Sequence, residues 1–268
     1  MISAFARGGA VLNDPRYVES ATQSAKFVRA NLWDEKSRKL YRSYRDGRSQ
    51  VEGFADDYAF MIQGMLDLYE ASFAIEWLKF AVTLQEAQDR LFLDEQAGGY
   101  FSTSGLDKSV VLRMKDDNDG AEPAASSVAA LNLLRLGQLQ ESAGLKERGA
   151  KTIDGFEAIL SRFPSAMPQM LVALDFRLNT PRQIVIAGRA GAPDTMELLT
   201  EVRRHFAPST IVLLADGAEG QAYLGQKLEV LASMSMSKGK AAAYVCENFT
   251  CQAPVTGAQE LAKILSAR

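Results

Sequence analysis

Acidic side chains gather in two stretches of the sequence and could together support acid–base chemistry. They form two Asp-Asp pairs and two further positions after the second pair: Asp56, Asp57, Asp116, Asp117, Asp119 and Glu122. Cleavage of a glycosidic bond needs one carboxylic acid to protonate the leaving oxygen, and one carboxylate to activate water or attack the anomeric carbon. We therefore take Asp57, Asp117 and Glu122 as acid–base candidates, and the other three as ligand-contact candidates.

A structural role is a simpler explanation for the same carboxylates. Asp57 can cap a helix that starts at Tyr58, and the stretch 116–119 fits a solvated loop. The stretch 116–120 also resembles a calcium-binding loop in composition, but Ser127 stands where the twelfth position of an EF-hand loop needs Glu. A cation or other ligand site is therefore a weaker third alternative.

Aromatic residues lie near the same stretches of the chain. They include Trp33, Tyr41, Tyr44, Tyr58, Trp77, Tyr100 and Phe101. Aromatic faces can stack on sugars, so Tyr58 and Tyr100 are further ligand-contact candidates. Aromatic side chains at helical spacing more often belong to the core.

The other reactive residues offer little chemistry. Two Cys and one His are too few for a zinc site with four His or Cys ligands. Cys246 and Cys251 could close a local disulfide or stay reduced, and their spacing lacks the helix-start geometry that activates a thiol in thioredoxin-like sites. His205 fits a surface position at a helix end, and the stretch 188–191 fits a tight turn better than a phosphate loop. We expect no cofactor and no metal.

The elements that must position the Asp-Asp pairs repeat along the chain. A shift of 60 residues without gaps places 32–35 on 92–95, 40–43 on 100–103, and 54–57 on 114–117. The unit is a helix, an Asp-Glu turn, a short hairpin, an Asp-Asp loop and a helix, so the two pairs should face the same side. Repeats of this size bury their apolar faces on their neighbours, which predicts an αα-solenoid or αα-toroid unless similar helix ends match by chance.

Helical periodicity dominates the first two thirds of the chain. It predicts helices over 15–32, 57–71, 73–92, 126–136, 142–162 and 167–177. Asp14 before Pro15 is the first clear helix start. A closed ring of six hairpins would need about 360 residues at this period, so we expect an incomplete ring. Residues 1–7 read as the middle of a helix, and we hypothesise that Met1 is an internal methionine of a longer chain.

The pattern changes after Pro181. The expected elements are a strand over 184–186, a helix over 194–206 capped by Asp194, strands over 211–214 and 242–246, and a last helix opened by a capping box at Thr256. The first three form a β-α-β unit with parallel strands. We predict a mainly α fold with an αα-hairpin toroid segment over 1–180. An α/β module follows over 181–268, and its C-terminal helix packs on the toroid.

Composition excludes several classes of protein. The chain has 268 residues, of which 47% are hydrophobic, and this is typical of a globular fold rather than a disordered one. It has 30 Lys and Arg against 33 Asp and Glu, without the basic surplus of a nucleic-acid binder. No apolar run approaches the roughly 20 residues that span a bilayer.

Six stretches carry a resemblance to a known family. They are 1–12 (MISAFARGGAVL), 53–70 (GFADDYAFMIQGMLDLYE), 88–101 (QDRLFLDEQAGGYF), 112–136 (LRMKDDNDGAEPAASSVAALNLLRL), 182–188 (RQIVIAG) and 244–254 (YVCENFTCQAP). In them the chain resembles the C-terminal portion of the spermatogenesis-associated protein 20 family, whose members carry a thioredoxin-like domain. The resemblance implies a toroid similar to six-hairpin glycosidases and sugar epimerases, without the thioredoxin-like domain that precedes it.

The acidic stretches match this family with two departures. Asp57, Asp117, Asp119 and Glu122 fit the family pattern, whereas members often have Glu in place of Asp56. Members also have Asn where this chain has Ser126, and a serine would only partly replace an asparagine that held a ligand.

Three functions remain open at this point. The resemblance implies a carbohydrate-related activity linked to fertility, of hydrolase type because toroidal epimerases rely on histidines. A second possibility is a non-catalytic binding region that serves the family's own thioredoxin-like domain, and a third is an inactive fragment. We expect a carbohydrate or that domain as partner, no nucleic acid and no membrane, and the compartment stays open.

Overall fold

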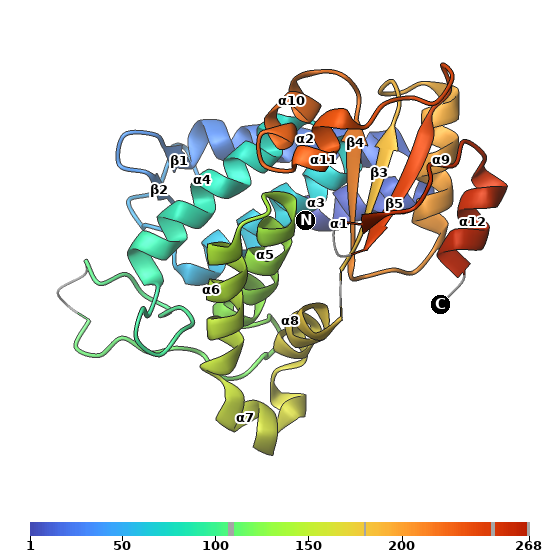
Figure 1. The fold of residues 1–268 in the computed structure, drawn as a ribbon. Coiled ribbons are helices and arrows are strands. Elements are labelled where there is room, and N and C mark those ends of the chain that lie inside the picture. The colour runs from blue at the N-terminus through green and yellow to red at the C-terminus, as the bar shows by residue number, and fades with distance from the viewer. Residues whose placement is uncertain (107–109, 180, 248–249, 267–268) are drawn as a thin grey trace.

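A computed structural model describes residues 1–106, 110–179, 181–247 and 250–266, and shows helical hairpins that lead into a small sheet (Figure 1). The helical part contains α1 (Ile2–Leu12), α2 (Pro15–Asn31), α3 (Ala55–Ser72), α4 (Ile75–Phe92), α5 (Ala125–Leu139), α6 (Ala143–Asp154), α7 (Glu157–Arg162) and α8 (Pro168–Leu178). A short 3-10 turn, Pro164–Ala166, precedes α8. The predicted helices of this part are thus present, and the N-terminal stretch forms α1.

Two layers of helices form an arc. In the inner layer α1 packs on α3, α3 on α5, and α5 on α8, while α2, α4 and α6 each pack on the inner helix that precedes them. This inner and outer arrangement is that of an αα-toroid, and it confirms the mainly α fold class.

One predicted helix is two helices in the structure. The expected helix over 142–162 breaks at Gly155 into α6 and α7. The Gly155 backbone lies against the hairpin after α4, where an added Cβ would be only 2.5 Å from the Ala97 carbonyl oxygen. The break therefore comes from a contact distant in sequence.

The hairpins of the two repeat units correspond in the structure. In the first unit β1 (Trp33–Asp34) pairs with β2 (Lys39–Leu40), and the partners Trp33 and Leu40 correspond to the bridged pair Leu93 and Tyr100 in the second. The turns also correspond, because Asp34 Oδ1 and Asp94 Oδ1 each accept two backbone N–H groups just after them. The units then diverge, since α3 begins at residue 55 but α5 begins at 125 rather than 115.

The C-terminal part is a sheet with helices on both sides. Its elements are β3 (Arg182–Ala187), α9 (Pro193–Arg204), β4 (Thr210–Ala215), α10 (Glu219–Gly225), α11 (Glu229–Ser233), β5 (Ala242–Glu247), β6 (Thr250–Cys251) and α12 (Ala258–Ser266). The strand order is β4-β3-β5-β6, with β3 and β4 parallel as predicted and the other pairs antiparallel. Residue 180, the expected boundary, lies outside the described residues.

The two faces of the sheet have different neighbours. Val185, Leu213 and Cys246 belong to the main core. This core also contains side chains of the inner helices and of α10 and α11. Ile184 and Val245 belong to a second apolar cluster with Leu261 of α12 and the apolar side chains of α9. Figure 1 shows α9 and α12 on this side of the sheet. The last helix therefore packs on α9 and not on the toroid as expected, because its apolar stripe covers the far face of the sheet.

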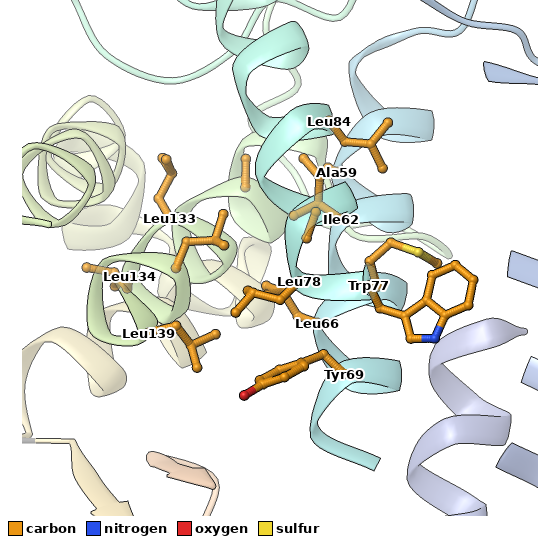
Figure 2. Close-up of a cluster of buried hydrophobic side chains, with 14 of the residues drawn as sticks. Ala59, Ile62, Leu66, Tyr69, Trp77, Leu78, Leu84, Leu133, Leu134 and Leu139 are labelled. Carbon is orange, nitrogen blue, oxygen red and sulfur yellow. The ribbon is translucent and has the colours of Figure 1, made fainter. Parts of the chain in front are cut away.

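The main core lies between α3, α4 and α5. Figure 2 shows Ile62, Leu66, Leu78 and Leu133 between these three helices, with Trp77 of α4 on the side of the cluster away from Leu133. All five are nearly inaccessible to solvent. The core holds the start of α3, where the first Asp-Asp pair lies, in a fixed position.

Gly98→Ala should lower the free energy of unfolding by about 2 kcal/mol. Gly98 has φ +77°, and an added Cβ would lie 2.3 Å from the Lys151 carbonyl oxygen. Gly144→Ala is the matched control, because a Cβ there meets no atom within 4 Å. It should leave stability unchanged or raise it by up to about 1 kcal/mol. Urea unfolding measures both, and equal stability of the two variants would contradict the prediction.

No helix in the described part of the chain is both long enough and apolar enough to cross a membrane.

Candidate functional site

The first Asp-Asp pair lies at the N-terminus of α3. Asp57 Oδ2 accepts a hydrogen bond of 2.8 Å from the Phe54 backbone N–H, which is the side-chain half of a capping box. Asp56 Oδ1 accepts the Asp57 N–H at 2.9 Å. Asp57 therefore contributes to capping from the third residue of α3, which begins at Ala55, and is not the N-cap expected before Tyr58.

Arg42 faces both carboxylates from the loop that follows β2. Its guanidinium lies 3.2 Å from Asp57 Oδ2 and 3.8 Å from Asp56 Oδ2. The guanidinium also stacks over the Phe54 ring, 4.9 Å from its centroid. Sequence reasoning missed Arg42, because nothing local in the chain pairs it with residues of a helix that begins 13 positions later.

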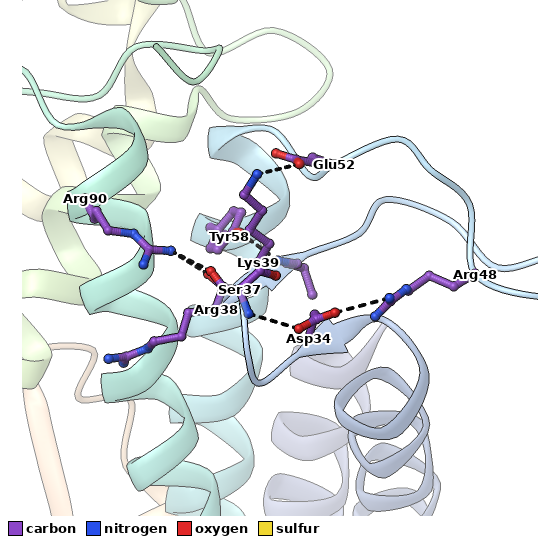
Figure 3. A network of polar contacts seen from close by, with 9 residues as sticks. Asp34, Ser37, Arg38, Lys39, Arg48, Glu52, Tyr58 and Arg90 are labelled. Carbon is purple, nitrogen blue, oxygen red and sulfur yellow. Dashed lines mark hydrogen bonds and ion pairs between the residues drawn. The ribbon is translucent and has the colours of Figure 1, made fainter. Parts of the chain in front are cut away.

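The hairpin that carries Arg42 is fixed by polar contacts (Figure 3). The Leu40 backbone N–H donates to Tyr58 Oη at 2.7 Å, and Lys39 pairs with Glu52 at 2.5 Å. Arg90 on α4 donates to the carbonyl oxygens of Ser37 and Arg38. These contacts tie the hairpin to α3 and α4.

The pKa of the Asp57 carboxyl is raised by its surroundings. Burial raises the pKa of the Asp57 carboxyl above its usual value, against the lowering effect of the Phe54 N–H bond. The negative charges of Asp56 and Glu122 raise this pKa further, while Arg42 lowers it. Glu122 therefore lies close enough to Asp57 to act on its titration, although the two are far apart in sequence.

The second acidic stretch reaches the start of α3 through Ser102. The Ala55 N–H donates to the Ser102 carbonyl oxygen at 3.2 Å, and Ser102 Oγ donates to Asp116 Oδ2 at 3.0 Å. Asp116, Asp117 and Glu122 are all exposed. Asp117 is not at a helix start equivalent to that of Asp57, because the loop before α5 is ten residues longer than the one before α3.

Asp119 has a structural position. Its Oδ1 accepts the Ala124 N–H at 2.8 Å, just before α5, and its Oδ2 accepts the Gln169 and Met170 N–H groups at the start of α8. One carboxylate thus caps two inner helices. Both oxygens accept backbone N–H groups, which indicates a structural role for Asp119.

The two candidate tyrosines are buried. Tyr58 and Tyr100 are each 1% exposed. Tyr58 Oη accepts the Leu40 N–H, and Tyr100 Oη donates to Asp89 Oδ1 at 2.6 Å. Neither ring offers a face for a sugar. Both tyrosines therefore belong to the core, which was the alternative to ligand contact. Ser126 is also buried, and its hydroxyl accepts the Tyr100 N–H at 2.9 Å.

A second charged cluster, which the sequence did not point to, links α1, α3 and α5. Arg135 lies 2.9 Å from Asp67 and 3.1 Å from Glu70, and Asp67 also pairs with Arg7 and accepts from Ser3 Oγ. The Arg135 and Asp67 side chains are 5% and 1% exposed. Burial raises the pKa of Glu70, the Asp67 charge adds to the rise, and Arg135 opposes it. This cluster joins three inner helices.

Within the described residues, no group of three or more His, Cys, Asp or Glu side chains is arranged to hold a metal ion.

Comparisons with known proteins show which proteins the chain is similar to. It is 40% identical over 99% of its length to spermatogenesis-associated protein 20 from human, and equally to the rat protein. The chain is therefore similar to one part of spermatogenesis-associated protein 20. It covers 35% of the length of these relatives. The resemblance to the spermatogenesis-associated protein 20 family is thereby confirmed, and no family model matches the chain.

A solved structure shows the same architecture. Cellobiose 2-epimerase from Bacillus thermoamylovorans B4167 superposes with a TM-score of 0.51 and 15% identity, over 94% of this chain and 63% of that one. The likeness confirms the toroid fold. At this identity it carries no information about the reaction.

Proposed function

We propose that the carboxylates at the start of α3 form a carbohydrate site with hydrolase-type acid–base chemistry. The observation that carries this proposal is the position of Asp57, half-buried at the start of α3 beside Asp56 and Arg42, where burial raises the pKa of its carboxyl. A carboxyl that keeps its proton at higher pH than usual can protonate a glycosidic oxygen. The structural neighbour is a cellobiose 2-epimerase, which supports a sugar as ligand by analogy of fold.

In this proposal the roles follow from burial and charge. Half-buried Asp57 is the general acid, and exposed Glu122 is the carboxylate that activates water, with Asp117 on the same loop as the alternative base. Asp56 and Arg42 would bind sugar hydroxyl groups, as acceptor and donor. The single histidine, His205, pairs with Glu201 on α9 in the sheet module, so carboxylates rather than histidines must supply the proton transfers.

Asp57→Asn should lower hydrolysis of a responsive glycoside by about 10²–10⁴-fold while changing its binding only a few-fold. The Asn amide oxygen can still accept the Phe54 N–H, so α3 keeps its cap. The wild-type rate should fall as pH rises through the folded-state pKa of Asp57, because the acid must be protonated. Reducing-sugar release from disaccharides and aryl glycosides measures the rate, and thermal stabilisation by the same sugars measures binding.

Asp154→Asn is the control, since this exposed carboxylate pairs with Arg177 at the end of α6 and is absent from the site. Equal loss in both variants would contradict the role of Asp57. If no sugar binds and none is cleaved, the proposal fails in favour of the alternative, a non-catalytic region that binds the family's thioredoxin-like domain. A purified domain of that kind, titrated against the chain, would then show saturable binding.

A further inference from the structure

A cavity of about 530 Å³ lies in the sheet module, away from the carboxylate site. It opens between the sheet and the segment from α10 to α11. Its apolar lining is Val185, Leu213, Leu228, Val230, Leu231 and Met234, and polar side chains from Glu141, Gln183, Gln226 and Lys227 also reach it. Cys246 and Cys251 form part of the same lining.

These two cysteines form a disulfide across the edge of the sheet. They lie directly opposite each other in the β5–β6 pair, at a sequence separation of 5. Cys246 is 3% exposed, whereas Cys251 is only partly buried. A thiol that enters the cavity can therefore reach the sulfur of Cys251 more readily than that of Cys246.

The disulfide contributes little to holding the rest of the fold together. β5 is paired with β3 from Gln183 to Ala187, and Val255 exchanges two backbone hydrogen bonds with Ala243. The closed loop is also short, and the loop-closure entropy that a disulfide removes from the unfolded chain is smallest for short loops. Opening the bond should therefore free only β6, with β5 still in place.

We propose that Cys246–Cys251 is an exchangeable disulfide, which a dithiol reduces by way of the cavity, and that reduction loosens the wall that β6 contributes. One thiolate of the dithiol attacks Sγ of Cys251. The Cys246–Cys251 bond breaks, and Cys246 leaves as a thiolate that takes up a proton. The second thiol of the reagent then attacks its own sulfur in the mixed disulfide and releases Cys251, which is also protonated. The dithiol becomes a disulfide, and the protein disulfide becomes two thiols.

Reduced dithiothreitol is the probe for this exchange. In native buffer, alkylation and mass spectrometry should show reduction about tenfold or more faster than global unfolding, which a denaturant jump measures separately. Once reduction is complete, a short iodoacetamide pulse should label the partly exposed Cys251 before the buried Cys246. Hydrogen exchange should rise at the Gln252 amide, which donates to the Val245 carbonyl oxygen, and stay unchanged in α3 and α5.

Two matched variants test the route through the cavity. Val230 lines the cavity and Val172 lies on α8 outside it, and both are 46% exposed. Val230→Trp should slow reduction several-fold, and Val172→Trp should not. Equal rates in the two variants would overturn the route. Reduction only at the rate of global unfolding, or reduction that abolishes near-UV circular dichroism, would overturn the exchange itself and leave a purely structural disulfide.

Discussion

Arg135→Ala is expected to lower the free energy of unfolding by about 3–5 kcal/mol, the usual cost of removing one partner of a buried ion pair. Arg135 is the buried cation between Asp67 and Glu70 of α3. Its loss leaves the buried Asp67 and the partly buried Glu70 carboxylates together, with Arg7 as the remaining cation beside Asp67 among the described residues. Urea unfolding measures the change.

The deficit should depend on pH. Burial already raises the pKa of Glu70, and loss of the Arg135 charge raises it further. The folded state of the variant then binds more protons than the unfolded state, so its stability falls as pH rises through the folded-state pKa. The variant should therefore be closer to wild type near about pH 5 than near about pH 8.

A double-mutant cycle separates charge from packing. Arg135→Met together with Glu70→Gln should cost less than the sum of the two single changes, because the neutral amide needs no cation. Additive losses would show that the pair is not coupled. A loss below about 1 kcal/mol in Arg135→Ala would contradict the buried-charge account.

Asp119→Ala is expected to lower the free energy of unfolding by about 2–4 kcal/mol. The reason is that an N-cap contributes about 1–2 kcal/mol to each helix that it caps. The variant leaves the N–H groups of Ala124 and Gln169 without their carboxylate acceptor. Thermal and urea unfolding both report it.

Asp117→Ala is the control for Asp119, because Asp117 is exposed two residues earlier on the same loop. It should change stability by less than about 0.5 kcal/mol. Equal losses in the two variants would show that the loop as a whole, and not the double cap, is responsible.

Local signals in the sequence predicted the helices well. Asp14 accepts the Arg16 N–H and Pro15 opens α2, as the pattern required, because capping and a fixed φ act within a few residues. The short helices α10 and α11 were missed, since seven and five residues carry too little periodicity. Asp194 was predicted as an N-cap, but it lies in the first turn of α9 and its carboxylate also accepts the distant Ala241 N–H.

The candidate site was less predictable, because its contacts are long-range. The sequence indicated two acidic stretches as candidates, and in the structure the Glu122 charge adds to the rise in the pKa of Asp57. It could not show that Asp119 caps α8, 50 residues away, or that Tyr58 and Tyr100 point into the core. Arg42 and Arg135 were missed for the same reason, since their partners meet them only in the folded chain.

The sheet and the inner helices share one core, and this limits how the two parts of the chain can be separated or exchanged. The join between α8 and β3 separates two stretches of sequence, but Val185 and Leu213 complete a single apolar interior with the helices. A module excised at this join would expose the helix-facing side of its sheet to water, and the arc would lose the cover over the ends of α3 and α5. The two parts therefore form one cooperative unit, and exchanging either for a foreign part requires a matching apolar face.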